Sequence, residues 1–142
     1  MTEFQKEFSK RLIKADIDTD TGFLSEVMYY PPEDRETFYN FFVRSINKTI
    51  DYAYEDDQKT ILNLLDFLTT GEEELSQYVF LENIVIESVE QITTSYFVFK
   101  NKNSEKDLIA LSLSRSSWDK YEYDEDENLF VKMKEKITYV PA

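Results

Sequence analysis

Two kinds of periodicity divide the chain. In the first half, hydrophobic residues recur every three or four positions, which is typical of helices with one buried face. From Tyr78 onward, β-branched and aromatic residues alternate with polar ones, which is typical of strands. No repeat or low-complexity linker separates the two halves. The pattern therefore predicts a single domain over residues 1–142, mainly helical at 1–76 and mainly antiparallel β at 77–142.

Three helices are expected in the first half. The first is expected over residues 3–14, because Thr2 and Gln5 suit a capping box and aromatic or aliphatic residues follow at fourfold spacing. Pro31 and Pro32 precede acidic residues, a pattern that favours a helix start, and the hydrophobic stripe continues to about residue 54.

The third helix is expected after an acidic break, YEDDQ. Its hydrophobic stripe is Ile61, Leu64, Leu65 and Leu68, and Gly71 stands where a left-handed C-terminal cap would lie. These stripes are interpreted as core positions.

At least three antiparallel strands are expected in the second half, near residues 78–89, 94–101 and 106–114. A polar connection, NKNSEK, joins the second of these to the third. Residues 129–140 fit a strand or a helix, and we favour the strand. Helices followed by a meander predict an α+β fold, in which about three N-terminal helices pack on one face of a C-terminal antiparallel sheet of three to five strands.

Charge is the strongest compositional signal. The chain has 29 acidic and 16 basic residues, a formal net charge of −13. Such a surface repels nucleic acid and anionic membranes and attracts basic proteins. We therefore expect a basic protein partner, no direct nucleic-acid binding and no membrane contact. The N-terminus lacks an apolar signal-peptide segment and no apolar run approaches the length of a membrane span, so a cytoplasmic location is expected.

Residue types that are absent narrow the chemistry. The chain has no histidine, no cysteine and only two glycines, which excludes Ser-His and Cys-His nucleophile pairs, thiolate metal sites and glycine-rich phosphate loops. Carboxylate chemistry remains, but the sequence singles out no pair of acids. We expect a protein without enzymatic activity and without a cofactor.

One stretch, ADIDTDTGFLSE, resembles a calcium loop in its alternating acids. Asp16, Asp18 and Asp20 would be the ligands. The loop of a calcium-binding helical hand also needs glycine at its sixth position and glutamate at its twelfth, where this chain has Thr21 and Val27. We therefore interpret residues 16–22 as a turn and expect no metal.

Three acidic runs are the candidate partner-binding sites. The first combines six acids and two interleaved tyrosines over residues 119–127, the second lies between the predicted second and third helices, and the third follows Gly71. Their residues are Asp119, Tyr121, Glu122, Tyr123, Asp124, Glu125, Asp126 and Glu127; Asp51, Glu55, Asp56 and Asp57; and Glu72, Glu73 and Glu74.

Such runs can present rows of negative charge to a basic groove in place of a phosphate backbone. The hypothesis is a stoichiometric inhibitor of a nucleic-acid-processing protein, of the kind that phages and mobile elements use against host defence or that cells use as nuclease-immunity proteins. The likeness is one of composition and size only. The alternative is an accessory or structural interaction domain whose acidity serves solubility.

Overall fold

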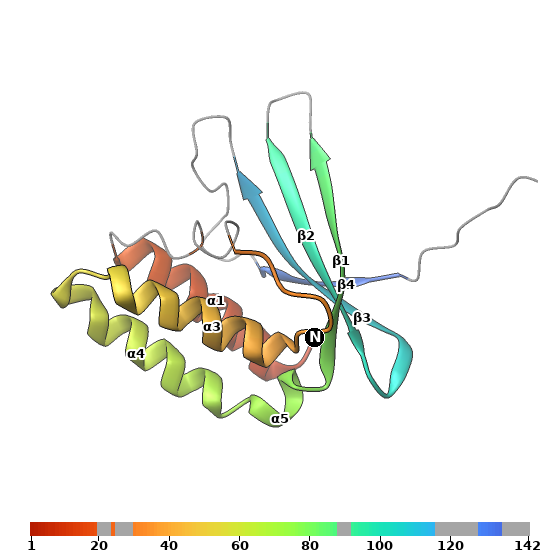
Figure 1. The fold of residues 1–142 in the computed structure, drawn as a ribbon, viewed down its shortest axis with the longest axis horizontal. Coiled ribbons are helices and arrows are strands. Elements are labelled where there is room, and N and C mark those ends of the chain that lie inside the picture. The colour runs from red at the N-terminus through yellow and green to blue at the C-terminus, as the bar shows by residue number, and fades with distance from the viewer. Residues whose placement is uncertain (20–23, 25–29, 88–91, 116–127, 135–142) are drawn as a thin grey trace, which may run out of the picture.

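A computed structural model describes residues 1–19, 24, 30–87, 92–115 and 128–134. N-terminal helices pack on a C-terminal four-stranded antiparallel sheet, which confirms the predicted α+β fold (Figure 1). The helices are α1 (Glu3–Asp18), α3 (Phe38–Tyr52), α4 (Glu55–Thr69) and α5 (Glu72–Leu75), and the strands are β1 (Tyr78–Glu87), β2 (Thr93–Asn101), β3 (Ser104–Arg115) and β4 (Phe130–Met133).

The first helix begins where the sequence predicts. Gln5 N donates to Thr2 Oγ1 at 3.2 Å, and Thr2 N donates to Gln5 Oε1 at 3.1 Å, so the capping box is complete. The helix runs past the predicted end at residue 14 as far as Asp18. Thr19 caps it, and the Thr19 hydroxyl donates to Ala15 O at 2.7 Å.

The predicted start of the second helix at Pro31 and Pro32 is wrong. Helix α3 begins at Phe38, and its N-cap is Thr37, whose hydroxyl accepts from Asn40 N at 3.1 Å. Asp34 and Arg35 before it form a turn, and Thr37 is extended and forms a bridge with Val79 of β1. This long-range pairing holds the backbone before α3 out of the helical conformation.

Helix α4 begins earlier than predicted. The acidic residues Glu55, Asp56 and Asp57, which were expected to precede the helix, form its first turn. Gly71 is not a left-handed cap: its φ is −108° and its ψ is 16°, and it is the N-cap of α5. Glycine at this position leaves space for the Phe4 ring. A Cβ atom at Gly71 would lie 2.2 Å from Phe4 Cζ.

The three predicted strands are confirmed, with small shifts at the ends of the second and third; residues 88 and 89 of the first prediction lie outside the described part of the chain. The connection between β2 and β3 consists of Lys102 and Asn103. The sheet order is β1-β2-β3-β4, and every pair is antiparallel. The strand favoured for the tail is confirmed at Phe130–Met133; residues 135–140 of that prediction lie outside the described part of the chain. A bulge at Leu81 interrupts the pairing of β1 with β2.

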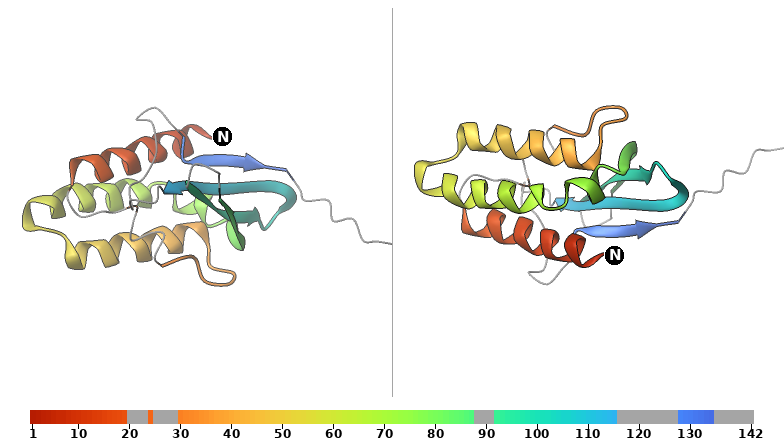
Figure 2. Two further views of the ribbon diagram at one scale, coloured as in Figure 1. Left: turned by 90° about the horizontal axis from the view of Figure 1, so that it is seen from above. Right: turned by 90° about the horizontal axis from the view of Figure 1, so that it is seen from below.

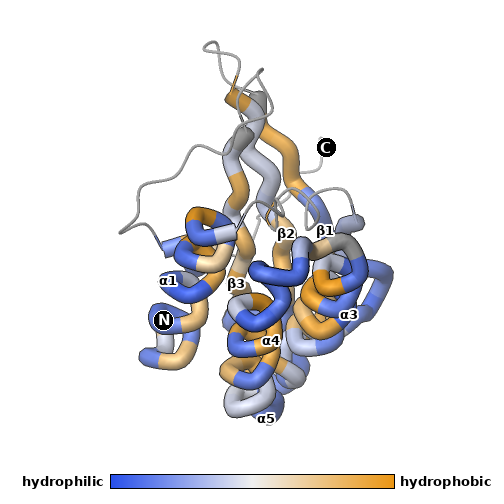
Figure 3. The backbone as a smooth tube through the Cα atoms, turned by 90° about the vertical axis from the view of Figure 1, so that its left-hand side faces the viewer, coloured by the Kyte–Doolittle hydropathy of each residue, from blue (hydrophilic) through white to orange (hydrophobic). Residues whose placement is uncertain are grey.

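The helices form one layer, in which α1, α4 and α3 lie side by side in that order (Figure 2). Hydrophobic and hydrophilic stretches alternate along these helices, as amphipathic helices require (Figure 3). At its two sides the layer reaches the edges of the sheet, since α3 contacts β1 and α1 contacts β4.

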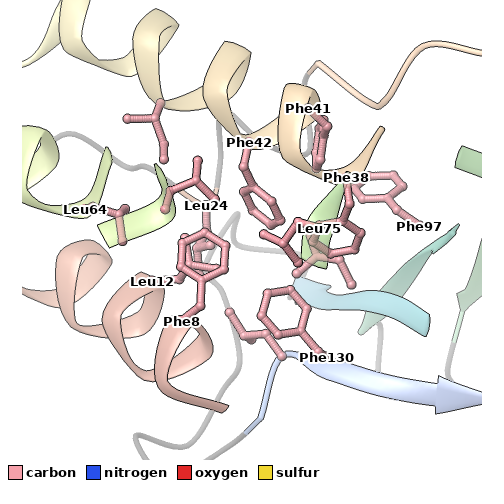
Figure 4. Packing of buried hydrophobic residues seen from close by; sticks show 14 of the residues in the cluster. Phe8, Leu12, Leu24, Phe38, Phe41, Phe42, Leu64, Leu75, Phe97 and Phe130 are labelled. Carbon is pink, nitrogen blue, oxygen red and sulfur yellow. The ribbon is translucent and has the colours of Figure 1, made fainter. Parts of the chain in front are cut away.

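Aromatic side chains fill the space between the helices and the sheet (Figure 4). The ring centroids of Phe38 on α3 and Phe99 on β2 are 4.2 Å apart, and those of Phe8 on α1 and Phe130 on β4 are 5.9 Å apart. Each such buried side chain contributes roughly 2 to 3 kcal/mol through removal of apolar surface from water. Packing of this aromatic core therefore carries the fold.

Candidate partner-binding surface

The first acidic patch lies at the corner between α3 and α4. We call Asp51, Glu55, Asp56 and Asp57 the corner patch. Asp51 is in the last turn of α3, and the other three form the first turn of α4, where carboxylates interact favourably with the positive end of the helix dipole. No side chain caps α4, so these carboxylates are its main electrostatic complement. Asp51, Glu55 and Asp56 are exposed, and Asp57 is half-buried.

The second acidic patch is α5 itself, and we call Glu72, Glu73 and Glu74 the α5 patch. Glu72 and Glu73 are exposed, whereas Glu74 is half-buried and accepts a hydrogen bond from Thr2 Oγ1 at 3.1 Å. Burial raises the pKa of Tyr39 on α3, and the nearby Glu72 carboxylate raises it further. Glu74 therefore has a structural contact with the start of α1, while Glu72 and Glu73 present their charge to solvent.

The two patches lie at opposite ends of α4 (Figure 1). A helix of 15 residues is about 22 Å long. Between the patches, the exposed residues of α4 include a cation and an aliphatic side chain, Lys59 and Leu62. One further acid, Asp66, is also exposed on α4. The two acidic runs therefore form separate patches, and this side of the molecule is not one continuous acidic face.

The longest acidic run, residues 119–127, lies outside the described residues. In the sequence it belongs to the connection from β3 to β4. The residues just before β4 are held by hydrogen bonds to the rest of the protein. Leu129 N donates to Ser9 Oγ on α1 at 2.7 Å, and Ser112 N donates to Leu129 O at 2.7 Å. Leu129 and Phe130 are both buried. Leu129 and Phe130, which follow the acidic run in the sequence, are therefore fixed on the core.

Helix α1 differs in charge from the patches. Its exposed residues include four cations: Lys6, Lys10, Arg11 and Lys14. The Arg11 guanidinium lies 4.1 Å from the ring centroid of Phe67, and its Nε is 3.1 Å from Glu7 Oε1. The acidic excess is thus concentrated at the two ends of α4 and is not spread evenly over the helical layer.

The candidate calcium ligands are not arranged as a loop. Asp16 and Asp18 both lie in α1, which corrects the interpretation of this stretch as a turn that begins at Asp16; Asp20 lies outside the described residues. Two positions along a helix correspond to a rotation of about 200°, so these two side chains leave α1 in different directions. Asp16 Oδ1 accepts from Leu24 N at 3.1 Å. No group of three acidic side chains in the described ranges is placed to hold a metal ion.

The sequence pattern did not lead us to a polar cluster around Asp107 on β3. Asp107 Oδ2 on β3 accepts from Tyr78 OH at 2.8 Å and from Asn101 Nδ2 at 3.0 Å. Burial raises the pKa of Tyr78 to about 12, and the hydrogen bond to Asp107 contributes to that rise. Lys132 Nζ is 4.0 Å from Asp107 Oδ1, an atom without a hydrogen bond among the described residues.

The signal for that cluster is present in the β3 pattern. Asp107 stands two residues before Ile109, in the same alternating series of positions as the buried Leu111 and Leu113. A carboxylate in an inward-facing series requires partners, which Tyr78 and Asn101 supply. The cluster borders a cavity of about 570 Å³ beside Gly71 and the N-terminus of α1.

Among the described helices, none has an apolar stretch long enough to cross a bilayer. Comparison of the chain with models of protein families, with curated proteins and with solved structures gives no match.

Proposed function

We propose that the protein is a small acidic binding protein without enzymatic activity, which acts as a stoichiometric inhibitor by covering the basic nucleic-acid-binding surface of a target protein. One observation carries the proposal. Asp51, Glu55 and Asp56 in the corner patch, with Glu72 and Glu73 in the α5 patch, are exposed, and no ion pair within the described ranges engages them.

Unpaired exposed carboxylates leave their field available to a partner. A basic groove that binds nucleic acid is lined by lysine and arginine side chains that contact successive phosphates. Two carboxylate patches at opposite ends of a helix about 22 Å long can engage two regions of such a groove. The run at residues 119–127 adds further acids and the tyrosines that suit protein interfaces. Opposed charge also accelerates association, most strongly at low salt.

The alternative is an accessory interaction domain whose acidity serves solubility. The cations on α1, with Lys59 between the two patches, favour this alternative, because they interrupt the acidic surface. The two functions differ in where they require the acidic residues to lie. An inhibitor needs charge in the patches themselves, whereas solubility depends on net charge wherever it lies.

Affinity capture with position-matched variants tests the proposal. The protein is immobilised, exposed to lysate and washed with increasing concentrations of duplex DNA. The patch variant replaces Asp51, Glu55, Asp56, Glu72 and Glu73 by their amides, and the control replaces five exposed acids elsewhere: Glu3, Glu7, Asp18, Asp34 and Glu105.

We expect the parent and the control to retain basic nucleic-acid-binding proteins that DNA releases, and we expect the patch variant to lose them. Equal capture by the patch variant, or capture that DNA does not affect, would support the solubility alternative.

A further inference from the structure

The outer edge of β1 is only partly covered. At its beginning, Phe80 N donates to Glu36 O at 2.8 Å, and Thr37 forms a bridge with Val79. From the bulge at Leu81 onward, β1 pairs only with β2 on its inner side among the residues that the structure describes. With respect to the described residues, the second half of β1 therefore presents an unpaired edge of main-chain donors and acceptors.

That half of the strand is apolar and exposed. Leu81, Val85 and Ile86 expose 51%, 54% and 53% of their surface. Val85 and Ile86 are neighbours, so they point to opposite faces of the sheet. The last part of β1 and the first part of β2 project beyond the helical layer (Figures 1 and 3), so the labelled helices cover neither face there.

The edge also adjoins a groove on the sheet. The groove has a volume of about 470 Å³, and it extends from Leu81 and Ile84 on β1 across Val98 on β2 and Leu108 on β3 to Met133 on β4. A strand added beside β1 would place alternate side chains along the near rim of this groove. Main-chain pairing and side-chain packing are therefore available at the same place.

Free edges in natural proteins are commonly protected by lysine, proline or short length. Strand β1 has 10 residues and contains no lysine, arginine or proline. Its only charged residues are Glu82 and Glu87. A second copy would bring together two edges of the same sign on chains of net charge −13, whereas a strand with lysine or arginine would be attracted.

We infer that the edge of β1 beyond Leu81 is a docking site for an extended segment of a partner protein, in which aliphatic residues alternate with lysine or arginine. The segment adds as a further strand to the sheet, its main chain pairs with β1, and its cations lie near the acidic side chain of Glu82. This surface is separate from the corner and α5 patches, so the inference stands without the proposed inhibitor function.

The test uses the whole protein and a synthetic peptide of about ten alternating valine and lysine residues. Amide hydrogen exchange is measured residue by residue by NMR. We expect alternate amides between Glu82 and Glu87 to gain about tenfold protection when the peptide is bound. A peptide of the same charge, with alternate N-methyl groups that prevent strand pairing, should give no such protection.

Two variants distinguish strand pairing at the β1 edge from non-specific electrostatic attraction between the peptide and the protein. Val85→Lys places a cation on the edge and should weaken peptide binding about tenfold. Ile17→Lys introduces the same change at another exposed aliphatic residue, 49% exposed on α1, and should leave binding unchanged. A folded Val85→Lys protein is recognised by an unaltered exchange pattern in β2 and β3.

Several outcomes would overturn the inference: equal binding of the N-methylated peptide, protection confined to other elements, or unchanged binding by Val85→Lys. Protection of the same amides at high protein concentration without peptide would assign the edge to a second copy instead. The patch variant should retain edge protection. If edge protection is absent while the patch variant still loses its basic partner, the docking inference alone is wrong.

Discussion

Arg44 on α3 holds Glu36 through two contacts, Nη2 to Oε1 at 2.6 Å and Nε to Oε2 at 3.0 Å. Burial raises the pKa of Glu36, but the hydrogen bonds and the positive charge of Arg44 outweigh it, so the pKa lies below its ordinary value. Glu36 O in turn accepts from Phe80 N. The ion pair thus fixes the segment that covers the first part of the β1 edge.

We expect Arg44→Met to lower the free energy of unfolding by about 2 kcal/mol, because it leaves the Glu36 carboxylate, 11% exposed, without its charged partner. Urea denaturation measures the change. The same substitution in a Glu36→Gln background should cost markedly less. Equal costs in both backgrounds would mean that Arg44 acts through its packing and not through Glu36.

Tyr78→Phe should cost about 1 kcal/mol at neutral pH, since it removes the hydrogen bond to Asp107. The pKa of Tyr78 is raised to about 12 in the folded protein, from an ordinary value near 10. Its contribution to stability is therefore complete below about pH 10 and is lost as the pH rises toward 12.

The stability difference between the parent and Tyr78→Phe should shrink over that alkaline range. Unfolding free energies measured from about pH 8 to about pH 11 test this. Parallel curves for the two proteins would contradict the assignment of the raised pKa to Tyr78.

Gly71→Ala should destabilise the protein by about 1 to 2 kcal/mol, because the added Cβ atom would meet the Phe4 ring at 2.2 Å. The ring must then leave its stack on Phe67, whose centroid is 5.0 Å away. Thermal or urea unfolding measures the effect. In a Phe4→Ala background the same change should be nearly neutral, and a persistent cost there would point to the backbone at Gly71.

Calcium should not change stability, because Asp16 and Asp18 leave α1 in different directions. Thermal unfolding curves with excess chelator and with about 1 mM Ca²⁺ should coincide. A clear upward shift with calcium, abolished by Asp16→Asn and Asp18→Asn, would identify a site that includes these acids.

Local patterns were enough to predict most of the architecture. Alternation predicts β1, β2 and β3, and the Thr2–Gln5 capping box predicts the start of α1, because these signals depend on neighbours in the sequence. The start of α3 could not be found in this way. The backbone before it pairs with Val79, some forty residues along the chain, and no local pattern reports that contact.

The surface features also depend on contacts between residues that are far apart in the sequence. The sequence identifies acidic runs, but only the fold places the corner patch and the α5 patch at opposite ends of α4. The sequence also gives no sign that Gly71 faces Phe4. The position of β1 at the edge of the described sheet was equally hidden, since the order of the strands decides which strand lies outside.

The most direct measurement of the proposed inhibitor function is the affinity for a captured basic partner as a function of salt. The variant to compare with the parent replaces four acids of the long run by their amides, Glu122, Asp124, Asp126 and Glu127. Shape is nearly conserved while four charges are removed, so affinity should fall about tenfold or more and its dependence on salt should flatten. The parent should also displace labelled DNA from the partner at a one-to-one ratio. A partner that binds the amide variant as tightly as the parent, or that retains its DNA while bound, would contradict the proposal.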